Sequence, residues 1–324
     1  MILILNCGSQ SIKWKIFDAN LKLKKEGKKE VYAKRDFKKI LVKELESIDF
    51  NISLAGHRVV HGGEYFKDPL LVTGSVLKKL QSFNKLAPLH NPYNILGIKV
   101  ASKIFPKTKH IAVFDTGFYK HLPDVSRIYP VPGNFQRFGF HGISHEYAAK
   151  EAAKKIKRPF DALKIISCHL GGGASITAVK NGRAIDTSMG FTPMDGLMMM
   201  TRSGAVDPGI VISLGKGAGR ILNYESGVKA VCNESEMLKV LKRKDRKARL
   251  ALDMFAYRIK KYIGAYYAVL GGCDLLVFTG AVGAGLAKTR NLILKDLDIL
   301  DKSKVVIIRP NEELSIAKKV INLQ

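Results

Sequence analysis

The segment "KIISCHLGGGASITAVKNGRAIDTS" (residues 164–188) decides the fold. An apolar strand runs into three glycines, an alternating strand follows, and Asn181-Gly182 marks a tight hairpin turn into a third strand. The segment "ILILNCGSQSIKWKIFD" (2–18) repeats this arrangement with Gly and Ser at its turn. Two such units predict two domains of similar architecture that flank a cleft.

The rest of the chain alternates strands and helices, which indicates an α/β protein. Strands are expected within 54–63, 109–118 and 274–285, the first and last of which run into glycine loops. Helices are expected at 91–105 and 248–272 and, after a loop, within 139–156, and residues 304–321 are expected to form a final strand and helix. In such folds, ligands bind at loops beyond the carboxyl ends of strands.

The length and composition place the chain in a broad class. Its 324 residues suggest two domains of about 100–200 residues each. No run approaches the roughly 20 apolar residues of a membrane span, and residues 1–6 form a strand pattern rather than a signal peptide. Four cysteines without a CxxC pair indicate reduced thiols, so we expect a cytoplasmic protein.

The charge is strongly basic, with 54 Lys and Arg against 28 Asp and Glu, a formal net charge of +26. Such a charge suits nucleic acid or an acidic membrane surface. The basic residues are spread along the chain, however, and no zinc-finger, RNP or helix-turn-helix pattern accompanies them. We therefore expect a lysine-rich surface that attracts small anions, with no nucleic-acid or membrane partner.

Glycine loops follow strands at three places, residues 8–11, 171–173 and 280–285. Three consecutive glycines serve either a tight turn or a backbone that lies against a ligand. Backbone N–H groups in such loops bind anions, although the chain has no Walker A pattern. Together the three loops predict a phosphate site.

Several side chains could carry chemistry beside that phosphate. Arg58 and Arg202 could grip carboxylate or phosphoryl oxygens, or form ordinary salt bridges. Asp115 ends a strand, where it could orient a ligand, bind a metal or cap a helix. The i, i+4 pair His141 and His145 could bind zinc, but no third ligand is near in sequence, so a histidine that donates a hydrogen bond to a phosphoryl group is favoured.

The chain resembles the acetate kinase family, which belongs to the acetate and sugar kinase/Hsp70/actin superfamily. The matching segments occur in the family's order: "NCGSQSIKWKIFD", "GHRVVHGGEYF", "LAPLHNPYNILGI", "AVFDTGFY", "RFGFHGISHEY", "HLGGGASITAVKNGRAIDTSMGFTPMDGLMMMTRSGAVDPG", "LALDMFAYRIKKYIGAY" and "PNEELSIA".

The resemblance implies a duplicated actin-like, ribonuclease H-like βββαβα domain. Residues 1–117 with about 310–324 would form the N-terminal domain, and residues 118–309 the nucleotide-binding and dimerisation domain. It implies the reaction ATP + acetate ⇌ ADP + acetyl phosphate with Mg²⁺, for which Mn²⁺ can substitute, in a homodimer. Direct transfer of this kind needs alignment and charge neutralisation more than a covalent nucleophile.

The resemblance also assigns residues to roles. Asp115, His141 and Arg202 would be catalytic, with Asp115 orienting Arg58 or metal-bound water. Arg58 and His90 would bind acetate, and Asn6 and Glu312 would hold the metal. The nucleotide would contact Lys13, the phosphate loop His169, Leu170, Gly171, Gly172 and Gly173, and the adenosine loop Ala281, Val282, Gly283, Ala284 and Gly285.

The chain departs from the family where the nucleotide binds. The usual HLGNG loop has Gly172 in place of Asn, as butyrate kinases do. The GIGEN loop has lost both polar side chains at Ala284 and Gly285, and residues 232–239 lack the family's arginine. The chain is also shorter than is usual in the family.

Three functions follow from these departures. The first is an acetate kinase with altered nucleotide affinity, and the second a related carboxylate kinase that uses pyrophosphate or takes propionate or butyrate. The third is a catalytically degenerate binding protein. The presence of every residue expected to act in phosphoryl transfer favours the first.

Overall fold

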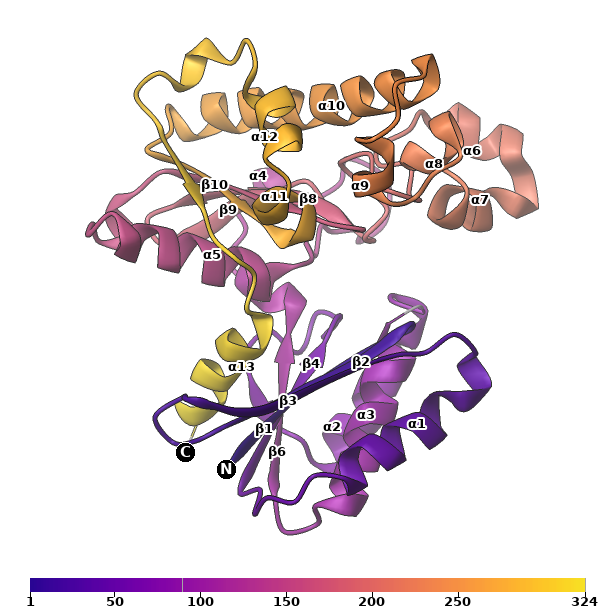
Figure 1. Cartoon of the computed structure of the whole chain (residues 1–324), viewed down its shortest axis with the longest axis vertical. Helices are drawn as coiled ribbons and strands as arrows, with labels where there is room; N and C mark the ends of the chain where they lie inside the picture. Colours follow the sequence, from indigo (N-terminus) through magenta and orange to yellow (C-terminus); the bar gives the residue numbers. More distant parts are fainter. Residues whose placement is uncertain (89, 324) are drawn as a thin grey trace. The chain divides into compact units, whose positions relative to one another are not determined.

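A computed structural model describes residues 1–88 and 90–323. It divides the chain into two compact units, Met1–Lys120 with Asn311–Gln324, and His121–Pro310 (Figure 1). The first unit is therefore built from two separate stretches of the chain, and the second is a continuous insertion. Each unit is an α/β domain around its own sheet.

The sheet of the first unit has the strand order β3-β2-β1-β4-β6-β5. Antiparallel β1 and β2 form the expected hairpin, while β1, β4 and β6 are parallel neighbours. The carboxyl ends of these three strands therefore lie at one edge. The strands are β1 Ile2–Gly8, β2 Ser11–Phe17, β3 Leu23–Glu30, β4 Leu54–Val59, β5 Leu70–Leu71 and β6 Lys109–Phe114.

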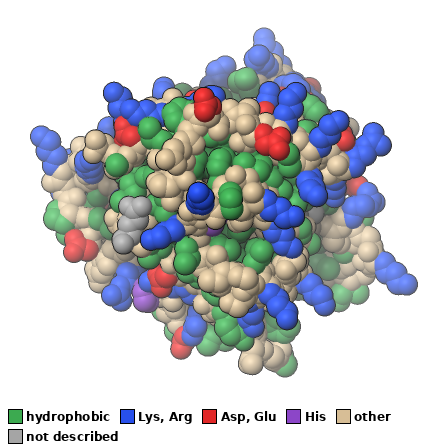
Figure 2. Space-filling view, turned by 90° about the horizontal axis from the view of Figure 1, so that it is seen from below, with side chains coloured by type: hydrophobic (Ala, Val, Ile, Leu, Met, Phe, Trp, Pro, Cys, Tyr) green, Lys and Arg blue, Asp and Glu red, His purple; other side chains and the backbone are tan. Residues whose placement is uncertain are grey.

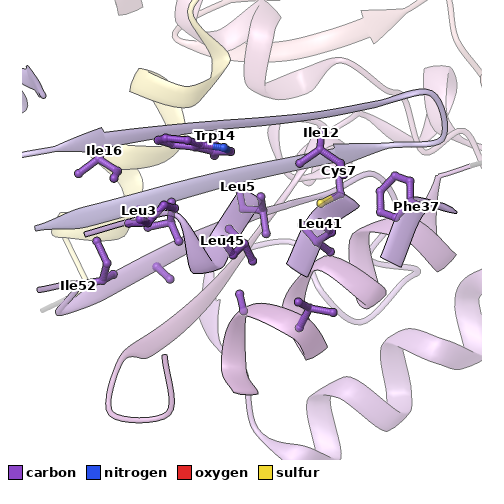
Figure 3. Packing of buried hydrophobic residues seen from close by; sticks show 14 of the residues in the cluster. Leu3, Leu5, Cys7, Ile12, Trp14, Ile16, Phe37, Leu41, Leu45 and Ile52 are labelled. Carbon is purple, nitrogen blue, oxygen red and sulfur yellow. The ribbon is translucent and has the colours of Figure 1, made fainter. Parts of the chain in front are cut away.

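One face of this sheet carries a hydrophobic core (Figure 3). Alternate side chains of β1 and β2, among them Leu3, Leu5 and Trp14, pack with Phe37 and Leu41 of helix α1. Helix α3 covers the same face beside α1 and α2. The helices are α1 Phe37–Glu46, α2 Gly74–Ser82 and α3 Asn91–Ile104.

The opposite face is covered by α13, Glu312–Ile321, which comes from the end of the chain. A glycine in β4 allows this close approach. A Cβ atom on Gly56 would lie 2.7 Å from Ile4 and 2.8 and 2.9 Å from Val320 and Ile316, inside van der Waals contact. The sequence thus fixes how closely α13 packs on the sheet.

The second unit repeats the topology of the first, with the strand order β11-β10-β7-β8-β9. Its β7, β8 and β9 are an antiparallel meander, and β10 and β11 continue the sheet parallel to β7. The duplication predicted from the two hairpin segments is confirmed. The strands are β7 Ile165–Leu170, β8 Ala174–Lys180, β9 Arg183–Thr187, β10 Leu275–Thr279 and β11 Lys304–Ile307.

Helices cover both faces of this second sheet (Figure 1). Helix α5, Gly142–Lys155, packs on β7 and β10, and the long α10, Arg246–Leu270, packs on β7 and β8. Smaller helices complete the unit: α4 Asp124–Arg127, α6 Pro208–Leu214, α7 Ala218–Tyr224, α8 Gly227–Cys232, α9 Met237–Val240, α11 Gly280–Gly285 and α12 Ala287–Leu294.

One expectation differs from the structure, and one strand was not predicted. The lysine-rich residues 23–30 form the edge strand β3, in which every residue except Lys24 pairs with β2 and the charged side chains stay exposed. The predicted loop over 281–285 is wrong, since these residues form the short helix α11. Arg290 stabilises its end by donating to the carbonyl oxygens of Gly283 and Ala284 at 2.9 and 3.0 Å.

The surface and the thiols agree with the sequence. Lys and Arg side chains are scattered over the face shown in Figure 2, with hydrophobic and neutral side chains between them. All four cysteines are free, and three of them are buried. Within residues 1–88 and 90–323, no helix has both the length and the apolar character needed to span a membrane.

Candidate active site

The first group of candidate functional side chains lies in the first unit, at the carboxyl ends of β1, β4 and β6. Because these strands are parallel neighbours, they bring Asn6, Arg58 and Asp115 together. Arg58 donates from Nε to both carboxylate oxygens of Asp115 at 3.2 and 3.1 Å, and from Nη2 to Oδ2 at 2.6 Å. The remaining nitrogen, Nη1, donates to Asn6 Oδ1 at 3.3 Å.

The start of α13 adds two carboxylates to this group. Glu312 Oε2 lies 3.3 Å from Arg58 Nη1. Glu313, which the sequence analysis did not single out, accepts a hydrogen bond from Asn6 Nδ2 at 3.2 Å and lies 3.7 Å from Lys15 Nζ. Two oxygens, Asn6 Oδ1 and Glu312 Oε2, thus converge on the same guanidinium nitrogen.

Burial and charge oppose each other in this group. Burial works to lower the pKa of Arg58, but the negative charges of Asp115 and Glu312 outweigh it and raise that pKa. Burial raises the pKa of Asp115, and Arg58 opposes the shift. The bidentate hydrogen bonds keep the guanidinium charged and its plane fixed.

Two buried asparagines of α3 hold the chain just beyond Arg58. Asn91 Oδ1 accepts from the His61 backbone N–H at 3.0 Å, and Asn94 Oδ1 accepts from that of Val60 at 3.0 Å. Asn94 Nδ2 also donates to the Cys7 carbonyl oxygen at 2.6 Å. The sequence analysis missed both residues, although two asparagines in an apolar helix pattern suggest buried partners.

The structure also places the other expected residues of this unit. Lys13 lies directly across the hairpin from Asn6, with an exposed side chain. His90 immediately precedes α3 and is partly buried. Lys13 is thus on the same sheet face and at the same level as Asn6.

The second group lies in the second unit, around the turn between β7 and β8. Gly171 N donates to Gly173 O at 2.9 Å, which closes the turn. A Cβ atom on Gly173 would lie 3.3 Å from His141 Cε1 and 3.6 Å from Arg202 Nη1, whereas one on Gly172 would meet nothing within 4 Å. Neither glycine has a positive φ. The absence of a side chain at Gly173 therefore lets the backbone of the turn lie close to the side chains of His141 and Arg202.

Arg202 is a partly buried cation for which the described residues supply no acidic partner. Within the described residues, no carboxylate forms an ion pair with it, and its hydrogen-bond acceptors are the Pro193 carbonyl oxygen at 3.4 Å and Met199 Sδ at 3.9 Å. Burial lowers its pKa. Because an uncompensated buried charge is costly, such an arginine is typical of an anion site.

Histidines and serines form a network beneath His141. Ser175 Oγ lies 2.9 Å from His141 Nδ1 and 2.8 Å from His145 Nε2, and Ser167 Oγ lies 2.9 Å from His145 Nδ1. Both ring nitrogens of His145 are thus engaged by serines, which argues against the zinc alternative. In the described part of the chain, no group of three or more His, Cys, Asp and Glu side chains could hold a metal.

His169, the first residue of the predicted phosphate loop, lies beside the same network. Its Nδ1 is 2.8 Å from Ser144 Oγ, and its ring centroid is 4.3 Å from that of His141. Leu170, the next residue, is buried. The end of β7 therefore places the loop and the two histidines together.

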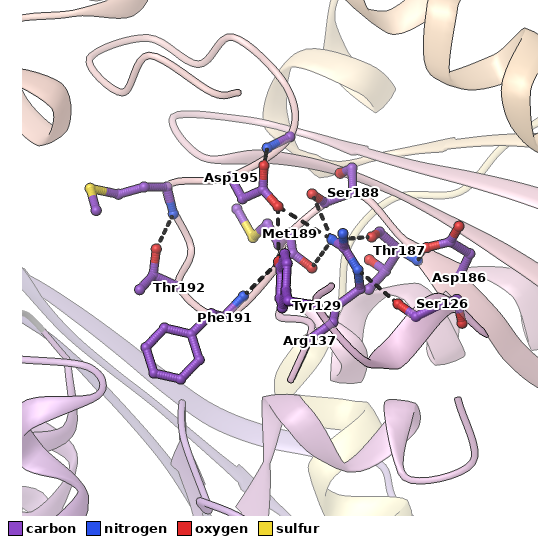
Figure 4. Close-up of polar contacts among 12 residues, drawn as sticks. Ser126, Tyr129, Arg137, Asp186, Thr187, Ser188, Met189, Phe191, Thr192 and Asp195 are labelled. Atoms are coloured by element: carbon purple, nitrogen blue, oxygen red, sulfur yellow. Dashed lines mark hydrogen bonds and ion pairs between the residues drawn. The ribbon is translucent and has the colours of Figure 1, made fainter. Parts of the chain in front are cut away.

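Arg137 anchors the segment that leads from β9 to Arg202 (Figure 4). Its Nη1 donates to the carbonyl oxygens of Thr187 and Met189 at 2.9 and 3.1 Å, and it pairs with Asp195 at 3.4 Å. Further along, Met200 N donates to Gly172 O at 3.3 Å. These bonds tie the Arg202 segment to β9 and to the glycine turn.

Helix α11 follows β10, the parallel neighbour of β7, and carries the five residues expected near adenosine. Val282 and Gly283 are buried, and a Cβ atom on Gly171 would lie 4.0 Å from the Ala281 nitrogen. A Cβ atom on Gly285 would meet nothing within 4 Å. The start of α11 thus lies close to the glycine turn.

The duplicated sheets and the two groups of side chains define a class. Oxygen donors surround an arginine in one unit, and in the other a glycine turn lies beside an arginine for which the described residues supply no ion pair. Such groups suit an enzyme that transfers a phosphoryl group. In such enzymes, cations and backbone amides balance the charge of a transferring phosphoryl group.

The chain belongs to the acetokinase family, whose model matches residues 24–304. It is 40% identical to the acetate kinase of Thermoanaerobacter pseudethanolicus, over 98% of this chain and 97% of that protein. Among solved structures, acetate kinase from Porphyromonas gingivalis matches with a TM-score of 0.87 and 33% identity, covering 99% of both chains. A propionate kinase from Francisella tularensis matches with a TM-score of 0.85 and 34% identity, also over 99% of each chain.

The comparison also bears on the expected shortness of the chain. The alignment with the Thermoanaerobacter protein has 393 positions and takes in 98% of a chain of 324 residues. The relative therefore carries segments that this chain lacks.

Proposed function

We propose that the protein is an acetate kinase, which transfers the γ-phosphoryl group of ATP to acetate and gives acetyl phosphate and ADP reversibly. The observation that carries the proposal is Arg202, a partly buried cation without an acidic partner in the described chain, next to the turn at Gly173. A phosphoryl group supplies the missing negative charge. Family membership supports the same reaction.

In the proposed reaction, an acetate oxygen attacks the γ-phosphorus, the new P–O bond forms, and the bond to the ADP oxygen breaks. A carboxylate nucleophile has no proton to lose, so no general base is needed. His141 and Arg202 stabilise the negative charge on the transferring group, which is worth about 10²–10³ in rate for each donor.

Arg58 binds the acetate carboxylate, with His90 near the substrate. The bidentate contact with Asp115 supports an orienting role for that carboxylate, since it fixes the guanidinium plane. Asp115 therefore acts in this proposal through Arg58 rather than as a proton donor or acceptor.

Asn6 and Glu312 would hold Mg²⁺, or Mn²⁺ in its place. Their converging oxygens are hard donors, and Mg²⁺ commonly uses only one or two carboxylates with substrate phosphates and water. The ion would neutralise phosphate charge when bound. Lys13, across the hairpin from Asn6, would contribute a further positive charge toward the nucleotide phosphates.

The nucleotide would contact His169–Gly173 through its phosphates and Ala281–Gly285 through adenosine. Ala284 and Gly285 offer no polar side chain, and this observation favours a second candidate, a carboxylate kinase that takes pyrophosphate as its donor. Because a propionate kinase is among the structural matches, acids longer than acetate are also candidate phosphoryl acceptors.

We also infer that the protein forms a homodimer and works in the cytoplasm. Exposed apolar side chains on α6, with Ile212 80% exposed, support association of the second unit with another copy. Four free thiols support a reducing compartment. Light scattering on the purified protein tests the dimer.

The test of function is acyl phosphate formation trapped with hydroxylamine, with Mg²⁺ and either ATP or pyrophosphate as donor, and acetate or propionate as acceptor. We expect activity with ATP and acetate, and a loss of about 10²–10³ in kcat in Arg202→Ala. Activity with pyrophosphate but not with ATP would show that pyrophosphate is the phosphoryl donor. If the folded protein forms no product with either donor, the third alternative, a catalytically degenerate binding protein, would be favoured.

A further inference from the structure

A chain of hydrogen bonds runs inward from His141 through Ser175 and His145 to Ser167. The successive distances are 2.9, 2.8 and 2.9 Å. The last three side chains are fully buried, on β8, α5 and β7. These contacts lie entirely within the second unit.

The number of available hydrogens links the tautomer of the His141 ring to that of the His145 ring through this series of hydrogen bonds. Burial, with a smaller effect from His169, lowers the pKa of His145 well below its usual value, so its ring is neutral and carries one N–H. The Ser175 hydroxyl also has one hydrogen. When Ser175 donates to His141 Nδ1, it must accept from His145 Nε2–H; when it donates to His145, it must accept from His141 Nδ1–H.

The geometry favours the first arrangement. The Nε2 edge of His141 faces the glycine turn, since a Cβ atom on Gly173 would lie 3.4 Å from Nε2. Under the proposed function, this edge needs an N–H to donate to a phosphoryl oxygen. A neutral ring with hydrogen on Nε2 has an unprotonated Nδ1, which must accept a hydrogen bond from Ser175.

We propose that Ser175 and His145 are positioning residues that hold His141 neutral, with its proton on Nε2, so that it donates to the transferring phosphoryl group. This inference rests on the proposed function. Ser167 O–H then donates to His145 Nδ1, His145 Nε2–H donates to Ser175, and Ser175 O–H donates to His141 Nδ1. Every bond in the chain has one donor and one acceptor.

The backbone supports a held orientation. His141 has a φ of 58°, in the left-handed region that few residues other than glycine adopt, and its carbonyl accepts from His145 N at 2.9 Å at the start of α5. Such backbone geometry persists where surrounding contacts impose it.

One charged group near His141 disfavours a positive charge on its ring. His169 from β7 packs against it with ring centroids 4.3 Å apart, and His145 faces it through Ser175. Arg202 approaches the same glycine turn, with Nη1 3.6 Å from the Gly173 Cβ position. A permanent positive charge nearby disfavours a second one on the imidazole.

The test is nitrogen NMR of the protein labelled with ¹⁵N-histidine, assigned with His141→Gln. We expect His141 to show a protonated Nε2 and an unprotonated Nδ1 throughout pH 6–8. A protonated Nδ1 at pH 8, in either the neutral or the doubly protonated form, would overturn the proposal. This measurement needs no turnover, so it stands apart from the outcome of the kinase assay.

Variants give the functional half of the test. Ser175→Ala should lower kcat about tenfold, leave KM for both substrates within about twofold, and bring the two His141 nitrogen shifts closer together. Ser175→Thr, which keeps the hydroxyl, should restore both readouts.

Thr177→Val is the matched control, because it removes another buried hydroxyl of β8 that bonds to Thr187. We expect it to leave the His141 shifts and kcat unchanged. Unchanged shifts and kcat in folded Ser175→Ala, or equal losses in the control, would overturn the proposal.

Discussion

Two neighbouring glycines allow a matched test of the phosphate turn. Gly172 and Gly173 both have backbone conformations open to alanine, since neither φ is positive. An added methyl group would meet nothing within 4 Å at Gly172, but would lie 3.3 Å from His141 Cε1 and 3.4 Å from His141 Nε2 at Gly173. The two variants thus differ mainly in contact with His141 and Arg202.

The size of the effect follows from that contact. Carbon atoms pack best at about 3.5–4.0 Å, so the His141 ring must move by a few tenths of an ångström. A displacement of about 1 Å at a reacting centre costs about 10² in rate, so Gly173→Ala should lower kcat about threefold to tenfold. Gly172→Ala should keep the wild-type kcat.

Stability separates this effect from damage to the fold. Removing a glycine at a compatible position stabilises a protein by about 0.4–1 kcal/mol, because the unfolded chain loses freedom. We expect neither variant to melt below the wild type in a thermal scan, while hydroxamate assays show loss of kcat only in Gly173→Ala. A wild-type kcat in folded Gly173→Ala would refute the assignment of this turn to the reacting phosphoryl group.

Two further predictions concern stability and nucleotide binding. Burial, together with the charge of Lys67, lowers the pKa of His61 to about 3, so the unfolded state binds more protons below pH 6.5 and stability falls as pH drops toward 3. Between pH 7 and pH 5, His61 should lower the free energy of unfolding by about 2 kcal/mol. His61→Asn can still accept a hydrogen bond from Gly63 N, and its free energy of unfolding, measured with urea, should fall by about 2 kcal/mol less over the same range. The same pH dependence in the variant and the wild type would contradict this. Ala284→Glu with Gly285→Asn should lower KM for ATP without changing kcat, because the two polar side chains can contact adenosine and open space around Gly285 admits the new side chain there. An unchanged KM in steady-state kinetics would argue against adenosine binding at this helix.

Much of the fold could be predicted because the decisive pattern is local. The two hairpin segments predict the duplicated sheets that the structure shows. Residues 23–30 escaped prediction because an exposed edge strand needs no apolar alternation when its backbone pairs with β2.

The candidate site was harder to predict in full. Arg58 and Asp115 stand out as charges at strand ends, but Glu313 meets Asn6 only because α13 returns to the first sheet from the end of the chain. Similarly, Ser175 is an ordinary strand residue until tertiary packing places it between two histidines. Contacts of this kind depend on topology, which a local pattern does not carry.

The return of α13 to the first unit has a consequence for synthesis. Residues 311–323 leave the ribosome after the whole second unit, so the nascent chain holds β1 and β4 without the helix that covers them. Until then Ile4 lacks part of its apolar cover and Arg58 lacks Glu312. The first unit is therefore the last to mature.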